Sequence, residues 1–138
     1  MNRQDLIDYL DEKEWINDRI KDINERKELL NKLTATYSDE PKGTSSIQDR
    51  IAEGLVTLLD ETAEYEKMLE NLKNKQIEVE NQLEKMENKR YRNILYKKYI
   101  RGLKIEEIAV DINQDYKYTC TLHGYALNDF DKICKKIS

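Results

Sequence analysis

The chain has 138 residues, of which 38% are charged and 38% hydrophobic, and it contains only four glycines and one proline. So few helix breakers favour an all-helical protein. No apolar run approaches the roughly 20 residues that would cross a bilayer, so we expect a soluble protein. The net charge of −4 is unevenly divided, since residues 1–88 hold 13 basic and 22 acidic side chains and residues 89–138 hold 11 basic and 6 acidic. Only the second part is suited to displace counterions from a nucleic acid.

The first predicted helix begins at Asn2 and ends near residue 36. Asn2 followed three residues later by Asp5 is a pattern that caps a helix N-terminus. Seam positions then alternate by threes and fours, and six of nine between residues 6 and 34 are apolar, which indicates a heptad repeat of moderate quality. Lys13, Lys27 and Thr34 interrupt this seam.

A loop is predicted between Tyr37 and Ser46, where Ser, Asp, Pro and Gly residues gather. A second helix is then predicted from Ile47 to Asn88. One apolar stripe cannot stabilise so long a helix alone, so it must pair with the first helix, with a second subunit, or with both. Eight of its ten seam positions are apolar, and we expect these to carry oligomerisation: Leu55, Leu58, Tyr65, Leu69, Leu72, Val79, Leu83 and Met86.

The heptad phase slips after Met86, because the next apolar residues are off the repeat by one position. A break near Asn88–Arg90 therefore divides the chain into a helical hairpin for oligomerisation, residues 1–88, and a second domain, residues 89–138. The helix that opens the second domain is expected to end at Gly102.

Two shorter helices joined by a turn are predicted next. Ile105, Ile108, Ala109 and Ile112 recur at 3.6-residue spacing, which predicts a helix from 104 to 112 with one buried face. Asn113 tolerates the left-handed backbone that ends such a helix.

Asp115 can cap the following helix by accepting a hydrogen bond from the amide of Lys117 or Tyr118. That helix would bury one stripe, formed by Leu122, Ala126, Leu127, Phe130, Ile133 and Cys134. The fold expected is all-α: a long antiparallel coiled-coil-like helical hairpin followed by a C-terminal helix-turn-helix.

A helix-turn-helix places the first turns of its second helix against base edges in the major groove of double-stranded DNA. The residues expected there as base readers are Tyr116, Lys117, Cys120 and Thr121. Cationic and phenolic side chains nearby would contact phosphates, namely Arg90, Arg92, Lys97, Lys98, Arg101 and Tyr118.

The segment Ile105-Glu106-Glu107-Ile108-Ala109, followed after sixteen residues by Ala126-Leu127, resembles region 4 of the sigma-70 family. The residues 92–100 resemble the lead-in helix of that domain. Together with Leu122-His123-Gly124 and the loop 38–43, they make the chain similar to small phage regulators of late transcription of the ArpU and RinA type. The departures from the family pattern are Gln114 and Thr119 in place of apolar residues and Lys104 in place of a Ser or Thr cap.

This resemblance implies an activator of late or packaging genes, acting in the bacterial cytoplasm near the nucleoid. Its partners would be double-stranded DNA, a second copy of the chain (a dimer is favoured) and, as a further candidate, host RNA polymerase. Two alternatives stay open: a DNA-packaging factor like a small terminase subunit, and an interaction protein that holds polymerase or a sigma factor. The operator, the sign of regulation, the number of chains, and whether the long helices pair within or between chains stay open too.

The sequence gives no support for catalysis. His123 is the only histidine, Cys120 and Cys134 are too far apart on one helix for a disulfide or a metal site, and no glycine-rich phosphate loop is present. We therefore expect no enzyme, no cofactor and no metal.

Overall fold

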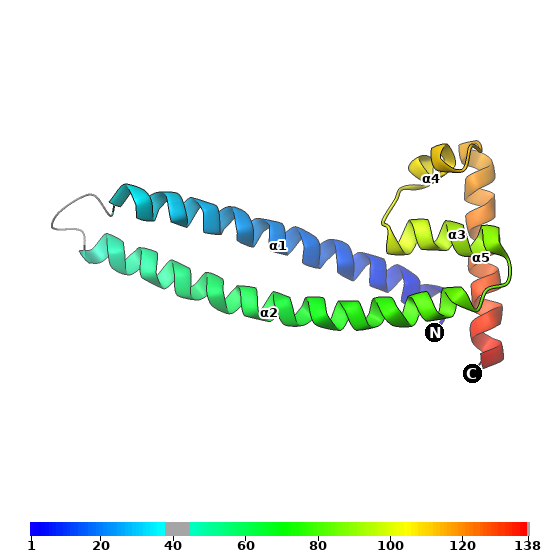
Figure 1. The fold of residues 1–138 in the computed structure, drawn as a ribbon, viewed down its shortest axis with the longest axis horizontal. Coiled ribbons are helices and arrows are strands. Elements are labelled where there is room, and N and C mark those ends of the chain that lie inside the picture. The colour runs from blue at the N-terminus through cyan, green and yellow to red at the C-terminus, as the bar shows by residue number, and fades with distance from the viewer. Residues whose placement is uncertain (38–44, 138) are drawn as a thin grey trace. The chain divides into compact units, whose positions relative to one another are not determined.

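The structure is a computed structural model that describes the backbone of residues 1–37 and 45–137 and the side chains of residues 1–33 and 49–136. Among these residues every regular element is a helix, and there is no strand (Figure 1). The all-α prediction is confirmed. In order, the elements are α1 (Arg3–Tyr37), α2 (Ser45–Glu84), α3 (Lys89–Leu95), the π-helical turn η1 (Tyr96–Ile100), α4 (Ile105–Asp111) and α5 (Tyr116–Ile137). No helix in the described ranges has the length and apolar character needed to cross a membrane.

The chain forms two compact units. The paired-helix unit is Glu14–Asn71, and the composite unit joins Met1–Lys13 to Leu72–Ser138. The composite unit thus includes the beginning of α1 and the end of α2, in addition to the residues 89–138 that the sequence marks as a second domain. The predicted loop falls mostly on residues 38–44, which lie outside the described residues.

In the paired-helix unit, α1 and α2 lie side by side and run in opposite directions (Figure 1). Arg26 Nη2 lies 2.8 Å from Glu61 Oε2, and Arg19 Nε donates to the Tyr65 hydroxyl at 3.1 Å. The two long helices therefore pair within one chain.

The residues assigned to an oligomerisation seam are packed within the single chain. Five of them, Leu58, Leu72, Val79, Leu83 and Met86, are buried, and Leu55, Tyr65 and Leu69 are half-buried.

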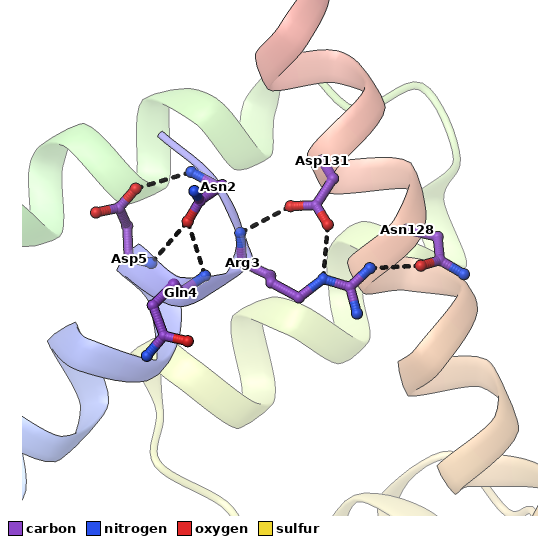
Figure 2. A network of polar contacts seen from close by, with 6 residues as sticks. All are labelled: Asn2, Arg3, Gln4, Asp5, Asn128 and Asp131. Carbon is purple, nitrogen blue, oxygen red and sulfur yellow. Dashed lines mark hydrogen bonds and ion pairs between the residues drawn. The ribbon is translucent and has the colours of Figure 1, made fainter.

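The N-terminus of α1 begins with the predicted cap (Figure 2). Asn2 Oδ1 accepts hydrogen bonds from the amides of Gln4 and Asp5, at 2.9 and 3.4 Å, while Asp5 Oδ2 accepts from the Asn2 amide at 2.8 Å. This reciprocal arrangement satisfies amides that have no partner inside the helix. The expected start of α1 is confirmed.

The break after α2 lies close to where the phase slip places it. α2 ends at Glu84, four residues before the expected Asn88, and residues 85–88 are not helical. Asn88 then caps α3, because its Oδ1 accepts from the amides of Arg90 and Tyr91 at 3.0 and 3.2 Å. α3 continues into η1, and Gly102 at φ 71° ends this stretch as expected, since few other residues adopt such a backbone.

Candidate nucleic-acid interface

The connection between α4 and α5 has the geometry that its residues predict. Asn113 has a φ of 58°, and Gln114 donates its amide to the carbonyl of Ala109 at 3.0 Å. Asp115 Oδ1 then accepts from the Tyr118 amide at 2.6 Å and caps α5. Both local predictions, the left-handed Asn113 and the capping Asp115, are confirmed. α4 begins at Ile105, one residue later than expected.

The inner face of α5 packs against α3 and α4. The expected stripe is buried at Leu122, Ala126, Leu127, Phe130 and Cys134, and only Ile133 is half-buried.

Thr119 lies on this inner face and is 0% exposed. A polar side chain at such a position needs a partner, because an unsatisfied buried hydroxyl destabilises a fold. The Thr119 hydroxyl donates to the carbonyl of Asp115 at 2.7 Å, so the departure from an apolar residue is accommodated.

The outer face of α5 carries a stripe at steps of four, three and four residues: Lys117, Thr121, Gly124 and Asn128. Residues at this spacing share one side of a helix. Lys117, Thr121 and Asn128 are exposed. Lys117 forms no ion pair within the described part of the chain, and the Thr121 hydroxyl donates to the Lys117 carbonyl at 3.1 Å. We call these four residues the outer stripe.

Aromatic side chains flank the outer stripe. Tyr116 is 54% exposed and Tyr125 is 57% exposed. Cys120, expected to face outward, is half-buried. A hydrogen bond with the Cys120 thiol raises the pKa of Tyr116, and the nearby carboxylate of Glu106 raises it further. Tyr116 therefore stays a neutral phenol that can donate a hydrogen bond.

The cations expected to contact phosphates differ in their surroundings. Arg90 is exposed and its Nη1 donates to the Tyr118 hydroxyl at 3.4 Å, beside the first turn of α5. Arg101 is exposed, whereas Lys98 is half-buried.

Two of the six residues predicted to contact phosphates share their surroundings with carboxylates of the same chain, and one of the two forms an ion pair. Lys97 forms an ion pair with Asp111 that ties η1 to the end of α4. This hydrogen bond and the Lys97 charge lower the pKa of Asp111. Arg92 lines a hollow together with Glu80 and Glu84 of α2. The positive charge of Lys97 is thus partly offset by Asp111.

Arg3 is a cation near the interface that the sequence does not reveal (Figure 2). Its amide and its Nε donate to the carboxylate of Asp131 at 2.8 and 2.6 Å, and its Nη2 donates to Asn128 Oδ1. Asn128 belongs to the outer stripe, so Arg3 reaches the C-terminal end of that stripe with its charge offset by Asp131. In the sequence, Asn128 lies 125 positions after Arg3 and Asp131 lies 128 positions after it, so no local pattern marks these contacts.

A cavity of about 200 Å³ lies beside the beginning of α5. Its lining residues are both apolar and polar: Arg90, Asn93, Ile94, Ile112, Gln114, Tyr118 and Leu122. Gln114, which stands where the resemblance expects an apolar residue, lines this cavity and is exposed. The polar residue therefore faces solvent and disturbs no core.

His123 packs against Tyr99. Its Nε2 lies 2.9 Å from the Tyr99 hydroxyl, and the two rings stack with centroids 5.8 Å apart. Burial lowers the pKa of His123, and the charges of Lys98 and Arg3 lower it further. Burial raises the pKa of Tyr99 to about 12. The lowered pKa of His123 and the raised pKa of Tyr99 keep both groups of this contact neutral at pH 7.

Among the described residues, no group of three or more His, Cys, Asp or Glu side chains is placed to hold a metal ion. Comparison of the chain with protein-family models, curated proteins and solved structures gives no match. The interface is therefore interpreted from its own geometry.

Proposed function

We propose that the chain is a sequence-specific DNA-binding transcription regulator in which α4 and α5 act as a helix-turn-helix. The observation that carries the proposal is the division of α5 into two faces. One face is buried against α3 and α4, and the other presents Lys117 and Thr121 to solvent from its first two turns. A helix anchored in this way can enter a major groove with its outer stripe directed at base edges.

The chemistry of the outer stripe suits readout of bases. Lys117 can donate to guanine O6 and N7, and Thr121 offers a hydroxyl and a methyl group, the latter suited to a thymine methyl. Tyr116 adds a phenolic donor at the entrance of the groove. Cys120 is half-buried beside Tyr116, and in this proposal it positions the phenol more than it touches a base.

Phosphate contacts would come mainly from the exposed cations. Arg90, held next to Tyr118, and Arg101 are exposed, and Lys98 adds a third charge. Lys97 contributes less, because it forms an ion pair with Asp111. Arg3 also contributes less, because it forms an ion pair with Asp131. Contacts of this kind orient a protein on DNA without reading its sequence.

A homodimer is the assembly that we propose, because two linked helix-turn-helix modules bind far more tightly than one. The seam of α2 is already covered within the chain, so a second copy would cover other apolar side chains. Five large ones are exposed on the paired-helix unit, namely Trp15, Leu29, Leu33, Val56 and Leu59.

Activation of late or packaging genes in a bacterial host is the regulatory role that the resemblance to phage regulators supports. The residues of the interface support only the proposal of DNA binding and say nothing of which genes are regulated. Host RNA polymerase stays a further candidate partner.

The test is selection from a library of random DNA duplexes with the full-length chain as bait. We expect enrichment of one sequence motif. A double variant, Lys117→Ala with Thr121→Ala, serves as the control, because both side chains are exposed and their loss should leave the fold intact. Recovery of no motif by the wild-type chain, or of the same motif by the double variant, would overturn the proposal or its assignment of the reading helix.

A further inference from the structure

Gly124 lies in the interior of α5, on the outer stripe between Thr121 and Asn128. Glycine is a poor helix former, because it loses more backbone entropy on folding than alanine does. A glycine in the middle of a helix therefore lowers stability unless its position requires it. The surroundings of Gly124 supply no such requirement.

Two other glycines of the chain differ from Gly124 in backbone conformation or in their neighbours. Gly102 adopts a φ of 71°, which strains other residues. At Gly54, a Cβ atom would lie 3.5 Å from Leu30, which is ordinary van der Waals contact in the space between α1 and α2. At Gly124 the backbone is helical and a Cβ atom would meet nothing within 4 Å. Neither backbone conformation nor packing within the described residues accounts for the missing side chain.

Gly124 is half-buried, but the stripe residues on either side of it, Thr121 and Asn128, are exposed, and a bare backbone at such a place permits close approach by another molecule. Gly124 continues the line of Lys117 and Thr121, the two residues assigned to base readout, and lies beside the exposed phenol of Tyr125. We propose that Gly124 is the point at which the floor of the DNA major groove comes into van der Waals contact with the backbone of α5. The inference rests on the proposed DNA-binding function and adds the residue that sets how deeply α5 enters the groove.

The inference predicts that replacing Gly124 by alanine raises the stability of the chain and lowers its affinity for DNA. Alanine favours the helix and meets no neighbour, so the melting temperature should rise by about 2–4 °C. The added methyl group would hold the DNA away from α5, so affinity for the selected duplex should fall by about tenfold or more. If the fold itself required Gly124, the substitution by alanine would lower the melting temperature.

The experiment compares three full-length chains: wild type, Gly124→Ala and Gly54→Ala. Thermal unfolding is followed by circular dichroism, and binding by anisotropy of two labelled duplexes, the one recovered by selection and a scrambled duplex of the same composition. Gly54→Ala is the matched control, because it is the same substitution inside a helix of the other unit and should leave the affinity unchanged.

A higher melting temperature with weaker binding for Gly124→Ala, and unchanged binding for Gly54→Ala, supports the inference. A lower melting temperature, or wild-type affinity, for Gly124→Ala overturns it while the DNA-binding function stands. If the wild-type chain selects no duplex, the proposed function fails and this inference fails with it.

Discussion

Lys13 of α1 donates a hydrogen bond through its Nζ to the carbonyl oxygen of Ile100, the last residue of η1. The final carbonyls of a helix have no partner within the helix, and a cation there also interacts favourably with the helix dipole. In the sequence, Lys13 is an interruption of the apolar seam. In the structure its hydrogen bond connects the N-terminal part of α1 to the end of η1.

We predict that Lys13→Met destabilises the composite unit by about 1–2 kcal/mol, because the carbonyl of the buried Ile100 loses its charged donor. Urea denaturation of the full-length chain measures this change. Lys27→Met is the matched control, since Lys27 interrupts the same seam in the paired-helix unit and methionine should be neutral or stabilising there. Equal effects of the two substitutions would show that the contact between Lys13 and Ile100 contributes nothing.

A second prediction concerns the fragment 89–138, which we expect not to fold alone. Its helices share their unit with buried Leu6 and Tyr9 of α1 and with buried Val79 and Leu83 of α2, all absent from the fragment. Exposing that much apolar surface should remove cooperative unfolding. Circular dichroism melts of the fragment and of the full chain test this.

A shortened chain, in which a brief glycine–serine linker replaces residues 31–51, provides the control for the fragment. It keeps every residue of the composite unit and should melt cooperatively. A sharp thermal transition in the fragment 89–138 would show that the two ends of the long helices are dispensable for this unit.

Local chemistry explains why much of the fold could be predicted from the sequence. Asn2, Asn113 and Asp115 act on amides or backbone angles within a few residues of themselves, so their roles can be read from short patterns. The apolar stripe of α5 follows from its period in the same way. Such features depend little on the rest of the chain.

Features that depend on contacts between distant residues could not be predicted. Arg3 forms an ion pair with Asp131, and Lys13 donates a hydrogen bond to Ile100. Both contacts join positions that no local pattern connects. The ion pair of Lys97 with Asp111 could not be predicted either, because nothing in the sequence distinguishes Lys97 from the other basic residues before the motif. Cys120 has the spacing of an outward residue, but its place next to Tyr116 leaves it half-buried.

The third prediction separates phosphate contact from base readout. Arg90→Ala or Arg101→Ala should weaken binding similarly on every duplex and reduce the salt dependence, because each removes about one phosphate contact. Lys97→Ala should have a smaller effect on the salt dependence, since Asp111 already neutralises that charge. Titrations at two salt concentrations measure both quantities.

Lys117→Ala and Thr121→Ala should instead narrow the difference in binding free energy between selected and scrambled duplexes by about 1–3 kcal/mol for each lost base contact. If either variant loses the same affinity for both duplexes, the outer stripe does not read bases.

The fourth prediction is a pH dependence of stability caused by His123. Burial and the charges of Lys98 and Arg3 hold its pKa below the ordinary value, so the unfolded chain binds a proton more readily than the folded chain. Stability therefore rises with pH while the unfolded histidine loses its proton, and it falls as the pH drops below about 6.5 toward the lower pKa of the folded state. Urea denaturation at pH 7.5 and 5.5 should show a lower midpoint at the acidic pH. His123→Gln keeps a side chain able to accept from the Tyr99 hydroxyl but cannot be protonated, so it should reduce this difference. An unchanged difference in the variant would assign the pH dependence to the carboxylates instead.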